Sequence, residues 1–285
     1  MPDDAMFTSP RGLREWYSFL KAHPDEIPLC ILMAVLAVPE FFIGLTSEGK
    51  RTFFDTRRFP WVARLEQDWP RIRHELDALL SKVDEIPNFQ EVQLEQGLLT
   101  KDDKWKTYFF YLYGGRVERN CRECPVTARL IKTIPGMKTA MFSVLGAHKA
   151  LSPHRGPYKG VLRYHLALKV PEPTDGCGIR VGAEVRHWEE GRSLIFDDSH
   201  EHEAWNQTEE TRVVLFVDIL RPLPFPFSLF NRLVVWGISR TPFIVDALAN
   251  LERWYRKVDK DPLPCPPQST LKAGRYRAHT RTLGR

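Results

Sequence analysis

Cysteine is scarce in this sequence, which has 285 residues. It has only five cysteines: Cys30, Cys121, Cys124, Cys177 and Cys265. An odd and widely scattered set argues against a disulfide framework and indicates a reducing compartment. The one CxxC run, at 121–124, has neither a second CxxC nor paired histidines with zinc-ligand spacing, so a zinc ribbon is unsupported. We expect an ordinary loop or helix start there, with a metal or redox role as the lesser alternative.

A continuous apolar run long enough to cross a bilayer is also missing. The most apolar stretch is 27–45, but Pro28, Pro39 and Glu40 leave only 29–38 unbroken. That is short of the roughly 20 residues that a membrane span needs. The N-terminal region also lacks the apolar core and cleavage site of a signal peptide. We favour a buried or interfacial helix at 29–38 and keep a span as the alternative.

Acidic residues are absent from the C-terminal tail KAGRYRAHTRTLGR, residues 272–285. The whole chain has 41 Lys and Arg against 36 Asp and Glu, a net charge of +5. A basic tail suits an anionic partner such as membrane lipid or nucleic acid, or is simply a solvated terminus. We expect a cytoplasmic protein without a nucleic-acid partner, and leave a peripheral membrane contact open.

The sequence is instead rich in short β-prone runs separated by Gly, Pro and Asp. Strands are predicted at 104–113, 140–145, 160–170, 178–181, 184–188, 193–196 and 212–220. Helices are predicted at 64–82, starting at Asp68 or kinked at Pro70, at 126–133, and in two pieces over 228–257. This spacing is typical of a β-sandwich or barrel with flanking N- and C-terminal helices. We divide the chain into an N-terminal extension (1–60), a catalytic domain (61–222) and a C-terminal part (223–285).

Two of these predicted strands contain charged residues. The alternation of side chains along a strand indicates which face each of these residues lies on. In 161–170, Arg163 and His165 share one face, opposite an apolar face that we assign to the core. Their face meets either solvent or a polar cavity, and the pattern alone slightly favours solvent. In 212–220 both faces are largely apolar, so Arg212 at the strand's start needs an anion for its planar fork of donors. A structural ion pair would satisfy it equally well.

Two histidines precede Arg212 at a suggestive spacing. His154 lies in a turn-like segment, His202 follows 48 residues later in a loop, and Arg212 is ten positions further on. Histidines brought together from separate loops suit a borderline metal such as iron or zinc, although each alone is more often a surface or core residue. The facial triad of non-haem iron oxygenases adds a carboxylate two positions after the first histidine, and here that position is Gly156.

The runs HRGPYKGVLRYHLAL (154–168) and WEEGRSLIFDDSHEHEAW (188–205) closely resemble the aspartyl/asparaginyl β-hydroxylase family. The likeness covers roughly residues 119–222 and is weaker through 105–113 and the helix predicted near Trp69. The resemblance implies a mainly β, double-stranded β-helix (jelly-roll, cupin-like) fold. It also implies Fe(II) held by two histidines and solvent, which would explain Gly156. The activity implied is that of an Fe(II)- and 2-oxoglutarate-dependent dioxygenase.

Carried over residue by residue, the resemblance implies His154 and His202 as iron ligands. Arg212 would bind the distal carboxylate of the 2-oxoglutarate co-substrate, with a further hydrogen bond from Ser143. Arg163 and His165 match the pair that contacts the metal-chelating end of the co-substrate. Oxidative decarboxylation of 2-oxoglutarate with O2 would then yield succinate and CO2 and hydroxylate an unactivated C–H bond.

Two substrates follow from the family, and we hold them near even: the β-carbon of Asp or Asn in a peptide or protein, and an acyl chain of lipid A. The apolar 29–38 segment, the apolar helix predicted after residue 228 and the basic tail favour the lipid branch by composition alone. The alternatives are a non-catalytic β-barrel binding module and a zinc hydrolase. A zinc hydrolase would usually need a third protein ligand.

Overall fold

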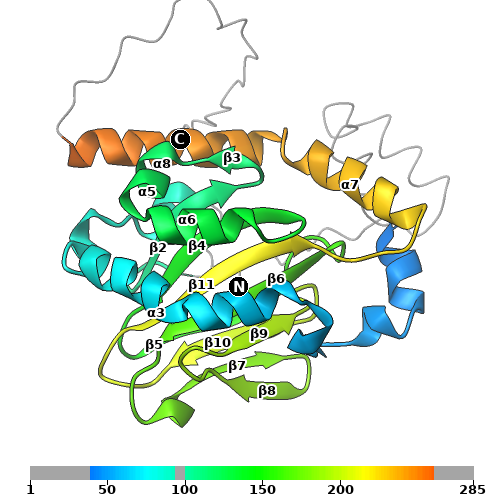
Figure 1. Ribbon diagram of the computed structural model, residues 1–285, viewed down its shortest axis with the longest axis horizontal. Coiled ribbons are helices and arrows are strands. Elements are labelled where there is room, and N and C mark those ends of the chain that lie inside the picture. The colour runs from blue at the N-terminus through cyan, green and yellow to red at the C-terminus, as the bar shows by residue number, and fades with distance from the viewer. Residues whose placement is uncertain (1–38, 94–99, 260–285) are drawn as a thin grey trace, which may run out of the picture.

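The computed structural model describes residues 39–93 and 100–259, whose arrangement Figure 1 shows. The strands are β1 (Phe53–Phe54), β2 (Trp105–Leu112), β3 (Gly115–Arg116), β4 (Met137–Leu145), β5 (Lys149–His154), β6 (Val161–Lys169), β7 (Cys177–Val181), β8 (Glu184–His187), β9 (Ser193–Phe196), β10 (His202–Asn206) and β11 (Arg212–Leu220). The α-helices are α3 (Trp61–Leu80), α4 (Phe89–Val92), α5 (Glu118–Glu123), α6 (Pro125–Lys132), α7 (Phe227–Ile238) and α8 (Pro242–Val258). Short 3-10 turns are η2 (Glu48–Lys50), η3 (Thr56–Arg58), η4 (Val83–Glu85) and η6 (Thr174–Gly176).

The strands form two antiparallel sheets. The large sheet has the order β1-β9-β6-β11-β4-β2-β3, and the small sheet has the order β5-β10-β7-β8. From β4 to β11 the chain crosses repeatedly between them: β4, β6, β9 and β11 lie in the large sheet, and β5, β7, β8 and β10 in the small one. This winding is that of a double-stranded β-helix, or jelly roll. Helices that precede and follow most of these strands in the chain flank the sheets (Figure 1). The predicted fold class, mainly β with flanking N- and C-terminal helices, is therefore confirmed.

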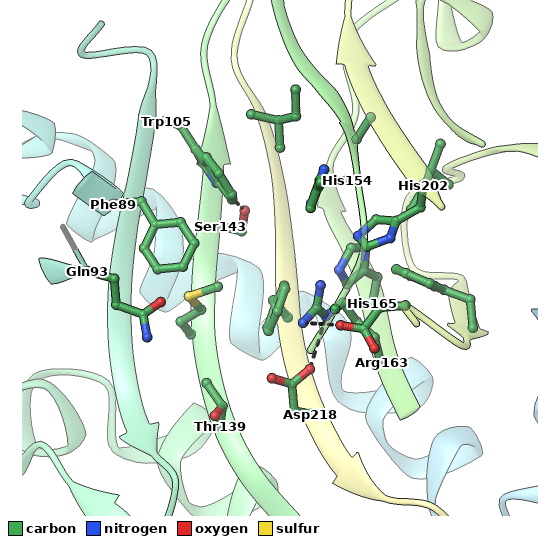
Figure 2. A pocket seen from close by; sticks show the side chains of 18 of the residues that line it. Phe89, Gln93, Trp105, Thr139, Ser143, His154, Arg163, His165, His202 and Asp218 are labelled. Carbon is green, nitrogen blue, oxygen red and sulfur yellow. Dashed lines mark hydrogen bonds and ion pairs between the residues drawn. The ribbon is translucent and has the colours of Figure 1, made fainter. Parts of the chain in front are cut away.

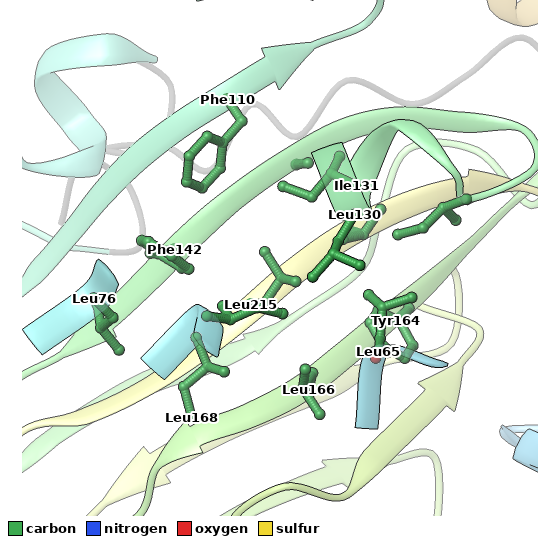
Figure 3. Close-up of a cluster of buried hydrophobic side chains, with 14 of the residues drawn as sticks. Leu65, Leu76, Phe110, Leu130, Ile131, Phe142, Tyr164, Leu166, Leu168 and Leu215 are labelled. Carbon is green, nitrogen blue, oxygen red and sulfur yellow. The ribbon is translucent and has the colours of Figure 1, made fainter. Parts of the chain in front are cut away.

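The two faces of the large sheet are built by alternation along its central strands. Leu162, Tyr164, Leu166 and Leu168 of β6 enter a core with Leu65 and Leu76 of α3, as Figure 3 shows. Every other residue of β11 joins the same core from the neighbouring strand. The predicted apolar face of 161–170 is therefore confirmed, and β11 is covered on both sides as expected.

The helix α3 begins earlier than predicted. It runs without interruption from Trp61 to Leu80 and includes Pro70, which the sequence placed in a first turn or at a kink. Pro70 lies on the exposed side of the helix, so water can donate to the Glu66 carbonyl that loses its helical partner. The buried stripe continues across it through Leu65 and Ile72, and this burial outweighs the lost hydrogen bond.

The two histidines predicted as iron ligands lie on strands rather than in the expected turn and loop. His154 ends β5, which is an edge strand of the small sheet, and Pro153 is tolerated there because an edge strand leaves some N–H groups unpaired. His202 begins β10, whose residues are alternately buried and partly exposed. The strand β5 was missed because its proline and polar residues read as a turn.

The three-part division of the chain stays a prediction. The structure adds that β1, from the proposed N-terminal extension, pairs with β9, and that Ile244, Ala247 and Leu251 of α8 pack in a second core cluster.

Cys121 and Cys124 are buried and unbonded at the junction of α5 and α6, and burial raises the pKa of both thiols. They fit the interpretation as a helix start. No helix within residues 39–93 and 100–259 is long and apolar enough to cross a membrane. The 29–38 run, the basic tail, Cys30 and Cys265 lie outside the described residues.

Candidate active site

A cavity of about 220 Å³ lies between the two sheets and gathers all six predicted site residues. They are Ser143, His154, Arg163, His165, His202 and Arg212. His154 and His202 come from the small sheet and the other four residues from β4, β6 and β11 of the large sheet. In Figure 2 the histidines lie across the cavity from Phe89, Gln93 and Thr139. Residues that are far apart in the sequence therefore converge on one space.

His154 and His202 face each other across neighbouring strands. They are partners in the β5–β10 register, and their ring centroids are 4.2 Å apart. The Nδ1 of His154 donates to the Ser152 carbonyl at 2.7 Å, and that of His202 donates to the His200 carbonyl at 3.0 Å. A carbonyl oxygen only accepts, so Nδ1 carries the proton in each ring and Nε2 keeps its lone pair. Backbone contacts of this kind orient histidines for metal binding.

The electrostatics of the cavity keep both rings neutral. Burial, together with the nearby Arg163 guanidinium and His154, lowers the pKa of His202 to about 3. Burial also lowers the pKa of His154, where the bond to Ser152 opposes the effect and Arg163 adds to it. Neutral imidazole is the form that binds a metal, so no proton has to be displaced near neutral pH.

The space beside Gly156 is filled by a carboxylate from another loop. A Cβ added at Gly156 would lie 2.1 Å from Oδ2 of Asp198, and the Gly156 N–H donates to the Asp198 carbonyl at 2.7 Å. Asp198 follows β9 and is four residues before His202. Sequence reasoning missed it, although the pair of aspartates just before His202 was a signal. A side chain at Gly156 has no room unless Asp198 moves.

Arg163 is held by two carboxylates. Its Nη2 is 2.8 Å from Oδ2 of Asp198, its Nε donates to Oδ1 of Asp218 at 3.0 Å, and its guanidinium lies 4.2 Å from the centre of the Phe216 ring. Burial raises the pKa of both Asp198 and Asp218, and Arg163 opposes this in each case. Arg163 and His165 line the cavity, so the slight preference for solvent was wrong: the small sheet covers the face that the pattern left open.

Arg212 has no carboxylate partner among the described residues. Its side chain is 2% exposed, its Nη1 is 3.4 Å from the Ser143 carbonyl, and its Nε has no hydrogen-bond partner. The guanidinium lies 4.4 Å from the centre of the Trp188 ring. Burial lowers its pKa to about 10, so it remains charged at neutral pH. The described residues therefore give Arg212 no structural ion pair, which was the alternative interpretation. A buried cation without a carboxylate partner is suited to bind an incoming anion.

His165 and Ser143 complete the polar wall. Neither ring nitrogen of buried His165 has a partner, and its ring packs among Trp188, Phe196 and Phe216. Burial, then the charges of Arg212 and Arg163, hold its pKa well below the ordinary value. The Oγ of Ser143 accepts from Nε1 of Trp105 at 3.1 Å, a contact that the sequence did not predict. The Ser143 hydroxyl proton is then left for a ligand.

These residues fit a divalent metal with an acidic organic ligand. Two neutral imidazoles with free Nε2 atoms suit iron and leave most coordination positions to other ligands. Orphaned polar atoms on His165 and Arg212 mark where a polar anion would recover hydrogen bonds. Within 39–93 and 100–259, no group of three His, Cys, Asp or Glu side chains is placed to hold a metal. The site therefore offers two protein ligands, and the individual roles predicted for its residues stay predictions.

Comparison with known proteins shows the family to which this chain is related. The family model described as aspartyl/asparaginyl beta-hydroxylase matches residues 66–222, which include all six site residues. This chain belongs to that family. The match includes the 119–222 likeness and the weaker likeness through 105–113 and near Trp69, and it confirms the expected family of hydroxylases.

Individual relatives differ in how much of their length is matched. The chain is 46% identical over 209 residues to an ornithine lipid ester-linked acyl 2-hydroxylase of Rhizobium tropici, which covers 73% of this chain and 74% of that protein. It is 34% identical over 184 residues to the human aspartyl/asparaginyl beta-hydroxylase, which covers 63% of this chain but only 23% of the human protein. A solved cupin domain of an XRE-family regulator from Enterobacter cloacae aligns with 42% of this chain at 9% identity and a TM-score of 0.30, covering 99% of that domain. Such a likeness says nothing about function.

Proposed function

We propose that this protein is an Fe(II)- and 2-oxoglutarate-dependent dioxygenase that hydroxylates an acyl chain of a membrane lipid. The observation that carries the proposal is a buried, unpaired Arg212 in the same cavity as the facing pair His154 and His202. A metal-binding module without co-substrate would not need an isolated guanidinium there, because burying an unpaired charge destabilises a fold.

Each predicted residue has a distinct task in this proposal. His154 and His202 would hold Fe(II) through Nε2, oriented by their Nδ1 bonds to backbone carbonyls. Arg212 would bind the distal carboxylate of 2-oxoglutarate, joined by the hydroxyl of Ser143, which Trp105 holds in place. With O2, the bound metal and 2-oxoglutarate supply the oxidising power that hydroxylates an unactivated C–H bond, giving succinate and CO2.

The remaining polar residues would orient the co-substrate and keep water out. His165 is neutral and lies among aromatic rings, so it can give or accept one hydrogen bond without adding charge. Arg163 is fixed by Asp198 and Asp218 and would act on the metal side of the cavity as a positioned positive charge. Because these groups are buried, their electrostatic effects are weakly screened by solvent.

An acyl chain is favoured as the substrate by the relative from Rhizobium tropici and by the cavity wall. The side of the cavity formed by β2, β4 and the end of α4 includes the apolar side chains of Phe89, Phe109, Leu112 and Met141, alongside the polar Gln93 and Thr139. In an ester-linked chain, carbon 2 is next to the ester carbonyl, so the head group lies on one side of the reacting carbon and hydrocarbon on the other. The four apolar side chains opposite the histidines suit that hydrocarbon. We therefore place an ornithine lipid or a similar lipid ahead of lipid A.

The β-carbon of Asp or Asn in a protein is the second candidate, and the human relative favours it. Such a substrate carries a carboxylate or amide that needs its own polar partner in addition to Arg212. Of the two other arginines at the cavity, Arg163 already pairs with two carboxylates and Arg155 is exposed. This leaves no buried, unpaired cation among the cavity-lining residues for a second carboxylate, so we rank this substrate lower.

The test is a reaction of the purified full chain with Fe(II), 2-oxoglutarate and O2. Detergent-dispersed ornithine lipid, lipid A and Asp- or Asn-containing peptides are offered separately. Succinate is measured beside the mass of each product, and fragmentation locates any added oxygen. We expect succinate formation coupled to the gain of one oxygen on an ester-linked acyl chain. Iron binding without succinate from any substrate would instead establish the binding-module alternative.

A further inference from the structure

The outer face of α7 is apolar and exposed. Phe225, Leu229, Leu233 and Trp236 are each more than half exposed, and Phe227 and Phe230 are more than a third exposed. The opposite face of the helix is buried through Val234 and Val235, which pack against Tyr158 and Val161. The helix is thus anchored to the protein on one side while its other side presents large side chains outward. A contiguous apolar surface of this kind marks an interaction site.

A second segment extends this surface. Residues 39–45 are helical, and Phe41, Phe42 and Leu45 are exposed. The rings of Phe42 and Phe227 are 5.8 Å apart, and Figure 1 shows this blue segment beside α7. Glu40 accepts a hydrogen bond from the Lys159 N–H at 2.9 Å, which ties the segment to the loop before β6. We call the exposed apolar residues of 39–45 and 225–236 the apolar end surface.

The charges along the α7 part of this surface are positive, and Glu40 of the 39–45 segment accepts the Lys159 N–H. No Asp or Glu occurs between positions 219 and 245, whereas Arg232 and Arg240 in this stretch are exposed. The Arg240 guanidinium lies 3.6 Å from the centre of the Trp236 ring, at the end of the helix. Exposed Trp and Phe beside arginines are typical of helices that lie in the head-group region of a bilayer. A second copy of this chain would offer the same positive charge and be repelled by it.

We propose that the apolar end surface docks onto a bilayer that contains anionic phospholipid. Exposed Phe, Leu and Trp side chains would enter the acyl boundary, and Arg232 and Arg240 would meet lipid phosphates. This docking does not depend on the chemistry at the iron site.

Docking would also bring the active-site entrance to the lipid. Tyr113 lines the cavity and packs against the cluster under α7, so one side chain joins the two regions. Arg155 and Pro157 line the cavity and are exposed, and the next residue, Tyr158, is buried beneath α7. The cavity rim and the docking helix are therefore neighbours. One part of the inference rests on the proposed function: the acyl chain of the substrate is taken directly from the membrane.

The test measures co-sedimentation of the iron-loaded full chain with large unilamellar vesicles. Vesicles of phosphatidylcholine alone are compared with vesicles that also contain phosphatidylglycerol. Leu233→Glu and Trp236→Glu place a charge on the apolar end surface without touching the core. The matched control is Val185→Glu, because Val185 is similarly exposed on β8 of the small sheet. We expect tight binding of wild type and control to the anionic vesicles, and binding at least about tenfold weaker for both α7 variants.

A second pair of variants tests the charge. Arg232→Ala and Arg240→Ala should each weaken binding to anionic vesicles by about fivefold and leave binding to pure phosphatidylcholine nearly unchanged. Equal vesicle binding by wild type and the Leu233 and Trp236 variants would overturn the proposal, as would absence of wild-type binding. A dimer in analytical ultracentrifugation that Trp236→Glu dissociates would also overturn it and assign the surface to a second copy. Binding without hydroxylation would leave docking intact and refute the proposed function alone.

Discussion

The two faces of the large sheet are made by the same strands and have opposite chemistry. On the outer face, beneath α3 and α6, Tyr164 and Leu215 lie in an apolar core, and the Tyr164 hydroxyl accepts from Ser193 at 3.1 Å. On the inner face, toward the small sheet, the same strands carry His165 and Arg212; both ring nitrogens of His165 and the Nε of Arg212 lack partners among the described residues. Because neighbouring residues point to opposite faces, the same strands form a packed apolar core on one face and a site with unsatisfied polar groups on the other.

The outer face of the sheet contributes to the stability of the fold, whereas the inner face has polar groups available for binding a ligand. Apolar burial on the outer face stabilises the folded chain. Unpaired polar atoms on the inner face cost stability and regain hydrogen bonds only with a ligand. Substitutions on the outer face should therefore lower the free energy of unfolding, whereas those on the inner face should lower activity.

The largest effect is expected at the metal-site histidines. His154→Ala or His202→Ala should abolish iron binding and reduce succinate formation to background, because each removes one of only two protein ligands. The melting temperature without metal should change little. Bound iron is measured by elemental analysis of the purified protein. His148→Ala is the control, since His148 is exposed and pairs with Glu209 outside the cavity; iron retained in the His154 variant would refute its assignment.

On the outer face, Leu215→Ala should lower the free energy of unfolding by about 2–5 kcal/mol, because it leaves a cavity in a fully buried position. Denaturant unfolding followed by circular dichroism measures this. The succinate turnover per folded molecule should stay near that of wild type. A loss of turnover with unchanged stability would show that the two faces are not separated as described.

Arg212→Met keeps the volume of the side chain but removes its charge. The KM for 2-oxoglutarate should rise about 10- to 150-fold, which corresponds to about 1.5–3 kcal/mol for a charge-assisted contact. The free energy of unfolding should remain equal or increase, since a buried unpaired cation is lost. Arg212→Lys retains charge without the planar fork and should lie between the two. Marked destabilisation by Arg212→Met would reveal a structural role instead.

The smallest effect is expected for Trp105→Phe, which removes the hydrogen bond to Ser143 and keeps an aromatic ring. We expect a rise of about two- to tenfold in the KM for 2-oxoglutarate, or about 0.5–1.5 kcal/mol. Steady-state kinetics at saturating substrate should show little change in kcat. If KM is unaffected while Ser143→Ala raises it, Ser143 is positioned without Trp105.

Much of this architecture was predictable from local patterns. The strands β6 and β11, the helix α6 and the break between α7 and α8 were expected, because their signals are an alternating or helical apolar period and Pro or Gly at the ends. The strand β5 was not, since Pro153 on an edge strand resembles a turn. Asp198 was missed because its role depends on a contact with Gly156 that only the fold creates.

The sequence by itself determined which residues share a face, since side chains on a strand alternate whatever surrounds it, and the motifs around His154 and His202 determined the family. Tertiary structure alone decided that the face with His165 meets a cavity rather than water. It likewise decided that, among residues 39–93 and 100–259, Arg212 lacks a carboxylate partner and α7 has an apolar face that these residues leave exposed. Burial and pairing depend on what packs from distant parts of the chain, and no local pattern specifies that.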